Sequence, residues 1–132
     1  MPILFPLLAF SFAVADCPAK IEVRQTLAEE IAGWLIGYEA LPHSLSGMTF
    51  FEGKPEEMAS LAPDNQSATG GENVAVWNFG VMSRPVWVAC HYAGTGIILQ
   101  RQLPKNTQSC SITYSARDTI AGLPVIEKVN CK

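Results

Sequence analysis

The chain has 132 residues, a formal net charge of −3 and a charged fraction of 16%. This length suits one domain of ordinary size. Nine Lys and Arg are outnumbered by twelve Asp and Glu and form no basic stripe, so the composition argues against nucleic-acid binding.

An apolar run over residues 3–14 ends in small residues directly before Asp16. This order is typical of a secretory signal peptide, although no Lys or Arg precedes the run. A membrane anchor is one alternative, but a span needs roughly 18 or more apolar residues and this run is shorter. A lipid-modified Cys17 is another, which the acidic residue in front of it disfavours. We therefore expect a signal peptide over 1–15 and a periplasmic or secreted domain over 16–132, without stable membrane insertion.

The first part of the mature chain mixes strand and helix signals. Residues 17–25 alternate between apolar and polar side chains, which predicts a half-buried strand. Thr26 and Glu29 have the spacing of a capping box and predict a short helix. The apolar triplet 34–36 lies between two glycines and predicts a second strand, and residues 48–52 predict a third.

The second part is dominated by strand signals. Pro55 and the two glutamates that follow it predict a short helix, which Pro63 ends. The polar stretch 64–73 predicts an exposed loop. Five further strands are expected at 74–79, 86–92, 96–102, 110–115 and 124–131. Short strands separated by turn signals predict an all-β fold, a mainly antiparallel barrel or sandwich with one or two short helices.

Four cysteines in an exported chain predict two disulfides. Three pairings are possible. Cys17 begins the first predicted strand and Cys131 ends the last, while Cys90 and Cys110 flank one meander. The favoured pairing is therefore Cys17 with Cys131 and Cys90 with Cys110, and the other two stay open. No Cys-x-x-Cys spacing occurs and exported thiols oxidise, so we expect neither a metal nor a cofactor.

No pattern of catalytic residues stands out. The two histidines, His43 and His91, have no acid, nucleophile or second ligand at a recognisable spacing, so we interpret them as structural. Adjacent residues on a helix point about 100° apart, so the glutamate doublets at 29–30 and 56–57 do not form pairs facing one cleft. Serine-hydrolase and metalloprotease motifs do not occur. We expect no enzyme, and an unrecognised acidic site is the least favoured alternative.

Two features predict contacts with a protein partner. The loop 64–73 is the longest polar segment with glycine, and loops on a rigid β scaffold often carry recognition, although a plain mobile connection is the alternative. Trp87 faces away from Cys90 in its predicted strand and is an exposed anchor if Cys90 lies inside. Burial in the core is the simpler fate for all three tryptophans, Trp34, Trp77 and Trp87. The expected partner-binding residues are Asp64, Asn65, Gln66, Glu72 and Trp87.

A set of residues spread over nearly the whole mature chain resembles one protein family. The set comprises Cys17-Pro18 with Ile21, Val23 and Gln25, Gly33-Trp34, residues 50–55, residues 61–63, Trp87, Cys90-His91-Tyr92, Thr95, Leu99, Leu103-Pro104, Cys110 and Cys131. The family consists of small exported four-cysteine proteins of Gram-negative bacteria, uncharacterised in activity, with members near type VI secretion gene clusters. The resemblance implies a periplasmic immunity protein against cell-wall-attacking effectors and supplies no catalytic residues.

Together these observations predict an exported periplasmic binding protein. Its expected role is that of an immunity or inhibitor protein against a cell-wall-degrading enzyme or effector, with a protein as its partner. A structural or envelope-associated accessory domain is the alternative.

Overall fold

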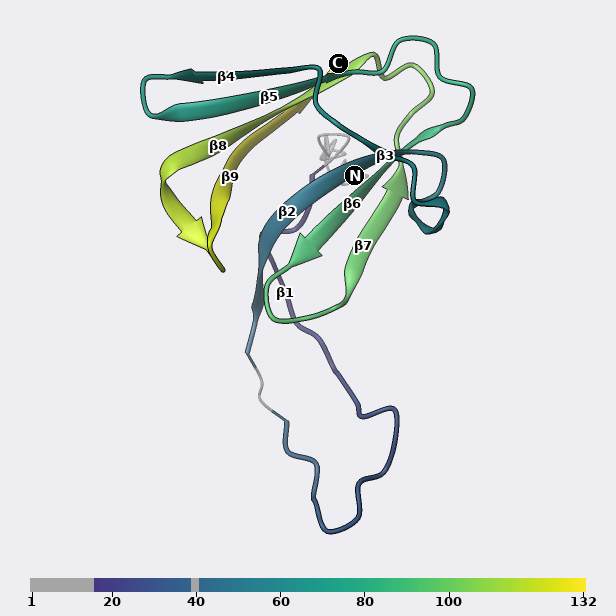
Figure 1. The fold of residues 1–132 in the computed structure, drawn as a ribbon, viewed down its shortest axis with the longest axis vertical. Helices are drawn as coiled ribbons and strands as arrows, with labels where there is room; N and C mark the ends of the chain where they lie inside the picture. Colours follow the sequence, from purple (N-terminus) through teal and green to yellow (C-terminus); the bar gives the residue numbers. More distant parts are fainter. Residues whose placement is uncertain (1–15, 39–40) are drawn as a thin grey trace, which may run out of the picture.

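Two antiparallel β-sheets make up the fold in a computed structural model that describes residues 16–38 and 41–132 (Figure 1). The all-β, disulfide-linked fold expected from the sequence is confirmed. The expected signal peptide over residues 1–15 lies outside the described residues. Within the described ranges, no helix is both long and apolar enough to cross a membrane.

The first sheet has five strands. They are β1 (Lys20–Ile21), β2 (His43–Glu52), β3 (Ser60–Leu61), β6 (Val86–Tyr92) and β7 (Ile98–Gln102). The order is β1-β2-β6-β7, and β3 pairs with the far end of β2. Phe50 pairs with Val88 and Met48 with Cys90, so these four side chains share one face of the sheet. All four are buried, which makes this the inner face.

The second sheet has four strands in the order β4-β5-β8-β9. They are β4 (Asn65–Thr69), β5 (Glu72–Asn78), β8 (Ser109–Ile120) and β9 (Leu123–Cys131). Two hairpins, β4–β5 and β8–β9, join side by side through β5 and β8. β9 also packs against β2, so the two sheets meet along that side (Figure 1).

Phe50 lies at the centre of the core between the sheets. Its side chain is completely buried, and its ring centroid is 4.9 Å from that of Trp77 and 5.6 Å from that of Phe79. The indole Nε1 of Trp77 donates a hydrogen bond of 2.9 Å to the carbonyl oxygen of Leu61, which satisfies its one polar atom. The core consists of Met48, Phe50, Ala75, Trp77, Phe79, Val88, Leu103, Cys110 and Ile112.

The prediction of a loop over 64–73 is wrong, because most of this segment is a β-hairpin. β4 pairs with β5 from Asn65 opposite Val76 to Thr69 opposite Glu72. Gly70 and Gly71 form the two-residue turn between them, both with positive φ, which glycine adopts at no steric cost. Residues 65–68 of β4 are all exposed, so this stretch lacks the apolar alternation that marks a half-buried strand.

The helix expected after Pro55 is only a three-residue 3-10 turn, η1 (Pro55–Glu57). Met58 follows with φ of 63°, a left-handed conformation that ends the turn. The chain then enters β3, which pairs with β2. Sheet pairing therefore overrides the helical pattern.

The segment before β2 also differs from expectation. The strand predicted over 17–25 is limited to Lys20–Ile21, and the helix at Thr26 and the strand at 34–36 are absent. The expectation that Trp34 lies in the core is wrong, because 77% of its surface is exposed. These residues have no sheet or layer beside them, so their apolar pattern creates no regular structure.

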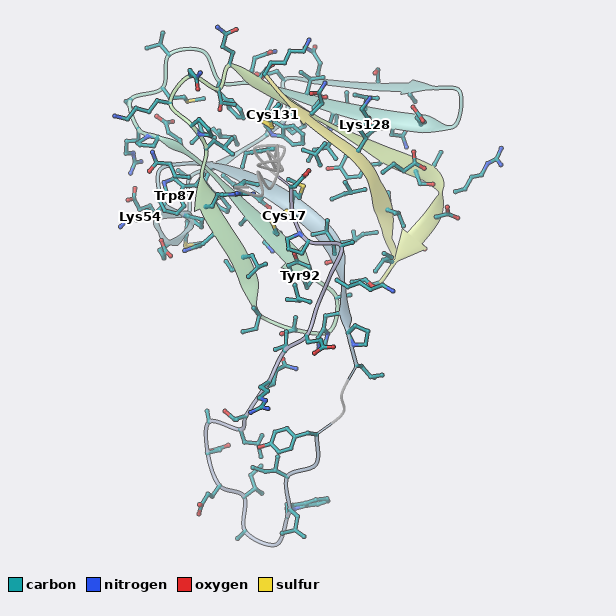
Figure 2. The ribbon with its side chains drawn as sticks, turned by 180° about the vertical axis from the view of Figure 1, so that it is seen from behind. Cys17, Lys54, Trp87, Tyr92, Lys128 and Cys131 are labelled. Atoms are coloured by element: carbon teal, nitrogen blue, oxygen red, sulfur yellow. A yellow bond between two sulfur atoms is a disulfide. The ribbon has the colours of Figure 1, made fainter. Side chains whose placement is uncertain are left out.

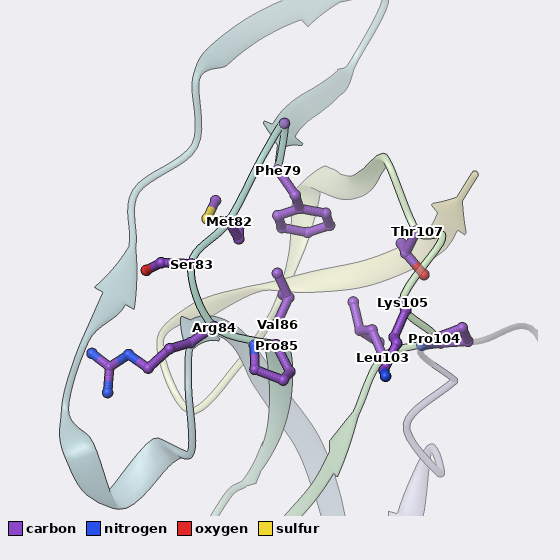
Figure 3. A pocket seen from close by; sticks show the side chains of 11 residues that line it. Phe79, Met82, Ser83, Arg84, Pro85, Val86, Leu103, Pro104, Lys105 and Thr107 are labelled. Carbon is purple, nitrogen blue, oxygen red and sulfur yellow. The ribbon is translucent and has the colours of Figure 1, made fainter.

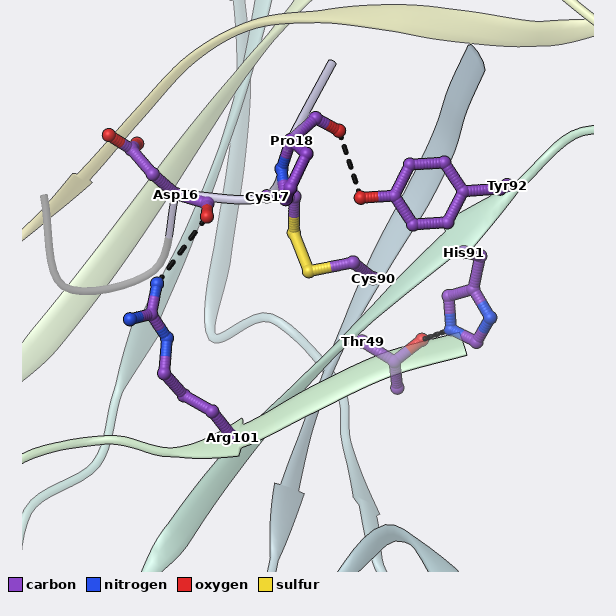
Figure 4. Close-up of a disulfide and its surroundings, with 8 residues drawn as sticks. All are labelled: Asp16, Cys17, Pro18, Thr49, Cys90, His91, Tyr92 and Arg101. Carbon is purple, nitrogen blue, oxygen red and sulfur yellow. Dashed lines mark hydrogen bonds between the residues drawn. A yellow bond between two sulfur atoms is a disulfide. The ribbon is translucent and has the colours of Figure 1, made fainter. Parts of the chain in front are cut away.

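The favoured disulfide pairing is wrong, although all four cysteines are bonded. The bonds join Cys17 to Cys90 and Cys110 to Cys131. Cys110 and Cys131 are directly opposite each other in the β8–β9 ladder. Cys17 lies against the inner face of the first sheet, where Cys90 points (Figure 4). The bonds therefore fasten the N-terminal segment to one sheet and the two strands of a hairpin to each other.

Two tyrosines, Tyr92 buried and Tyr114 partly buried, predict a loss of stability at high pH. The Tyr92 hydroxyl donates a hydrogen bond of 2.8 Å to the carbonyl oxygen of Pro18, and burial raises the pKa of both Tyr92 and Tyr114 above the usual value near 10. Above that pH the unfolded chain loses these protons before the folded chain does. The free energy of unfolding should therefore be unaffected by the tyrosines below about pH 9 and fall as the pH rises past about 10.

Urea unfolding between pH 8 and 11, with tyrosinate absorbance followed in parallel, measures this effect. The Tyr92→Phe/Tyr114→Phe protein is the control and should show a shallower decline. An equal decline in both proteins would assign the effect to other groups.

Candidate functional site

Both histidines make structural contacts. His43 Nδ1 donates a hydrogen bond of 2.7 Å to the carbonyl oxygen of Ala93, which ties β2 to the turn after β6. His91 Nε2 lies 2.9 Å from Thr49 Oγ1, in a hydrogen bond across the neighbouring strands β2 and β6 (Figure 4). Within residues 16–38 and 41–132, no group of three or more His, Cys, Asp or Glu has an arrangement suited to a metal ion.

The acidic residues around η1 bond to side chains of neighbouring segments. Glu52 accepts a hydrogen bond of 2.7 Å from Ser83 Oγ, Glu57 pairs with Arg84, and Glu56 accepts a hydrogen bond of 2.8 Å from the Gln100 side chain. The hydrogen bonds from Ser83 and Gln100 lower the pKa values of Glu52 and Glu56 respectively. A general acid needs a raised pKa instead. These carboxylates hold the η1 corner to the adjacent loop and strand.

A shallow pocket of about 310 Å³ opens beside this corner (Figure 3). The loop between β5 and β6, the first residue of β6 and the loop after β7 form its walls. The apolar side chains of Phe79, Val86 and Leu103 line it, together with the cationic Lys105. This combination suits an apolar group that carries a negative charge, but the pocket holds no pair of reactive side chains.

The hairpin residues expected to bind a partner lie on the second sheet. Asp64 Oδ2 accepts a hydrogen bond of 2.6 Å from the Asn78 backbone N–H, so this carboxylate closes the base of the hairpin. Asn65 and Gln66 are exposed on β4 near that base, while Glu72 is exposed at the opposite end, next to the turn. Their role in binding stays a prediction.

Trp87 lies on the first sheet and is separate from the hairpin residues. It is half-buried on the outer face, opposite Phe51 on β2 and Gln102 on β7. Figure 2 shows it away from β9, where Lys128 is labelled. The structure therefore places the five predicted residues on two surfaces, and the anchor role of Trp87 also stays a prediction.

A third surface was missed by the sequence analysis. Residues 22–38, which follow β1, project away from both sheets (Figure 1), and we call them the arm. Every side chain of the arm except that of Val23 is exposed. The large apolar side chains with half or more of their surface exposed are Leu27, Trp34, Leu35, Ile36 and Tyr38. No sequence signal identified this surface, because Leu27, Ile31, Trp34 and Leu35 recur near the helix period, which is typical of a buried apolar face.

The arm also has a concave side. Leu27, Ile31, Trp34 and Ile36 line a hollow of about 470 Å³, together with Glu30, Ala32 and Leu35. Monomeric soluble proteins rarely expose a contiguous apolar surface of this kind unless it binds something. A disulfide-linked β scaffold with such a surface is suited to contact with another molecule.

Comparison with known proteins supplies the family. Residues 39–132 match the family model described as type VI secretion system Tli immunity protein, and the chain belongs to this family. The chain is also 33% identical over 104 residues to a protein of Azospirillum brasilense described as an uncharacterized 16.3 kDa protein in the trpG 5' region. That match covers 74% of this chain and 69% of the other protein. No solved structure matches the chain significantly. The expected resemblance to a small family near type VI secretion loci is thus confirmed.

Proposed function

We propose that this chain is an exported periplasmic immunity protein that binds and neutralises a type VI effector acting on the cell envelope. The match of residues 39–132 to the immunity family carries the proposal. Residues 1–15 serve as the signal peptide, and residues 16–132 form the mature protein. A cell-wall-degrading enzyme is the effector class proposed first.

The disulfides support the periplasmic location. All four cysteines are bonded, and such bonds persist in oxidising compartments such as the periplasm. A type VI effector delivered to the periplasm meets the immunity protein there. Location and function are therefore compatible.

Neutralisation is proposed to occur by binding, without catalysis. The histidines bond to Ala93 and Thr49, and the carboxylates around η1 bond to Ser83, Arg84 and Gln100. The arm and the hairpin offer exposed surface for a stoichiometric complex. An inhibitor of this kind needs affinity and correct placement, which a rigid β scaffold provides.

A protection experiment tests the proposal. Each effector from the type VI secretion clusters of the same genome is directed to the periplasm of a susceptible host, with and without this chain. The full chain should restore growth against one effector, whereas a chain that begins at Asp16 and stays in the cytoplasm should not. Protection by the cytoplasmic form would contradict the location. Failure to protect against any effector would contradict the immunity role and favour an envelope-associated accessory function.

The effector class is measured with purified proteins. We expect an equimolar amount of the mature chain to stop the neutralised effector from releasing soluble fragments from isolated peptidoglycan. If that effector instead cleaves phospholipid, and the chain stops this reaction, the immunity role holds and the cell-wall target is replaced. A catalytically inactive effector should still form a one-to-one complex in size-exclusion chromatography.

A further inference from the structure

The apolar character of the arm points to a specific role in the proposed function. We propose that the arm, residues 22–38, is the element that enters the effector, and that it docks into an apolar cleft with a cationic rim. This inference rests on the proposed function and names the surface that carries it out.

Exposure of large apolar side chains is the first observation. Leu35 is 98% exposed, Trp34 77% and Tyr38 66%. By contrast, the aromatic side chains of Phe50, Trp77 and Phe79 are buried in the core between the sheets. Tryptophan and tyrosine dominate the binding energy of many protein interfaces when they fill a pocket of the partner. They belong to a segment that projects from the sheets (Figure 1), which allows them to reach into a recess of a partner.

The base of the arm is held firmly, which is the second observation. Before the arm, the Cys17–Cys90 disulfide fixes the chain, and Leu45 N–H donates a hydrogen bond of 2.8 Å to the Ala19 carbonyl oxygen. β1 and β2 then pair side by side at Ile21 opposite His43. A surface loop with a fixed base loses less conformational freedom on binding than a free segment does. The scaffold thus directs the arm without burying it.

The hollow on the concave side of the arm is the third observation. The hollow has a volume of about 470 Å³ and is lined mostly by apolar side chains, with Glu30 as the charged residue among them. A hollow of this composition accepts an apolar side chain of the partner while Trp34 and Leu35 contact the surrounding wall. The arm is therefore suited to a cleft of the partner that contacts it on more than one side.

The charge of the arm indicates the chemistry of the partner surface that it contacts. The arm carries three carboxylates, on Glu22, Glu29 and Glu30, against one guanidinium, on Arg24. This excess of negative charge opposes binding to an anionic lipid surface. It also opposes pairing with a second copy of the arm, and the whole chain has a net charge of −3. A protein cleft rimmed by Lys or Arg complements both the charge and the apolar surface.

The experiment measures affinity for the purified effector against which the full chain protects. The test protein is the mature chain with Trp34→Ala/Leu35→Ala, and the matched control carries Met58→Ala/Val81→Ala, which changes two side chains that are 82% and fully exposed elsewhere. We expect the arm variant to bind about 30-fold more weakly or worse, and the control to bind as the parent does. Because all four side chains are exposed, the thermal midpoints of both variants should match that of the parent.

The charge argument has its own variant. Glu29→Gln/Glu30→Gln should slow association about 3-fold or more at low salt, and the difference should shrink at 0.5 M salt. An unchanged association rate would overturn the cationic rim.

Other results would overturn the docking site. Parent-like affinity of the Trp34→Ala/Leu35→Ala protein would do so, and loss of affinity in Asn65→Ala/Gln66→Ala alone would move the site to the hairpin. Arm-dependent binding to phosphatidylglycerol vesicles, or arm-dependent dimerisation in sedimentation equilibrium, would replace the effector as occupant. A parent chain that neither protects against nor binds any effector would overturn the proposed function itself, and the inference with it.

Discussion

Replacing Phe50 by alanine should lower the free energy of unfolding by about 3–5 kcal/mol. The side chain is completely buried, and its ring contacts Trp77 and Phe79 from the other side of the core. Alanine removes most of this apolar contact and leaves a cavity, because Trp77 is fixed in β5 and Phe79 directly after it, and their rings cannot fully close the space. With a typical domain stability of about 5–15 kcal/mol, this single change removes a large share of the total.

Phe51 provides the matched control for this prediction. It is the next residue on β2, points to the outer face and is only half-buried opposite Trp87. Phe51→Ala should therefore cost clearly less, about 1–2 kcal/mol, in urea unfolding followed by tryptophan fluorescence. Equal losses from the two substitutions would mean that the core is not centred on Phe50.

The strands that enclose the core could be predicted from the sequence. The predicted strand over 86–92 has the same limits as β6, and the one over 124–131 matches β9 to within a residue. In β6, Val88, Cys90 and Tyr92 face the core and are buried. Burial of one face therefore requires an apolar residue at every second position, and this period of two is visible in the sequence. Such strands can be recognised in the sequence because one of their faces is buried.

Segments without a buried face could not be predicted. Residues 65–68 of β4 are exposed whichever way they point, so their polar side chains predicted a loop although their backbone lies in a sheet. The arm has the opposite property, since Trp34 and Leu35 are apolar but exposed. A sequence-based prediction assumes that apolar residues are buried, and an apolar surface that binds another protein does not follow this assumption. For this reason the candidate site was harder to find than the fold.

The disulfide pairing depended on strand register, which the sequence does not display. Ile120 pairs with Leu123 beside the turn of the β8–β9 hairpin, and an unbroken ladder from there would place Cys131 opposite Ile112. Irregularities between Thr113 and Thr119 shift the register by two residues and bring Cys131 opposite Cys110. Bulges of this kind have no reliable local signature, so a pairing inferred from strand order alone was wrong.

Removing the disulfides one at a time should destabilise the protein by unequal amounts. The Cys17–Cys90 bond spans 73 residues and the Cys110–Cys131 bond spans 21. In the chain-entropy description, a longer closed loop restricts the unfolded chain more strongly, which gives about 4 kcal/mol for the first bond and about 3 kcal/mol for the second. The double replacements Cys17→Ala/Cys90→Ala and Cys110→Ala/Cys131→Ala test this order by urea unfolding of the mature protein. Mapping of non-reduced peptides should first confirm one bond in each variant and both in the parent.

The two disulfides are similarly buried, so the two double replacements can be compared with each other. Cys90 and Cys110 are buried, at 6% and 1% exposure, and Cys17 and Cys131 are partly buried, so each double replacement removes one buried and one partly buried sulfur and loses similar packing. The difference between the two variants therefore reports mainly on loop length. A larger loss for Cys110→Ala/Cys131→Ala would contradict the entropic account and show that the direct link between β8 and β9 stabilises the folded hairpin. The expected order instead makes the Cys17–Cys90 bond the stronger constraint, and that bond is also the one that fixes the chain directly before the arm.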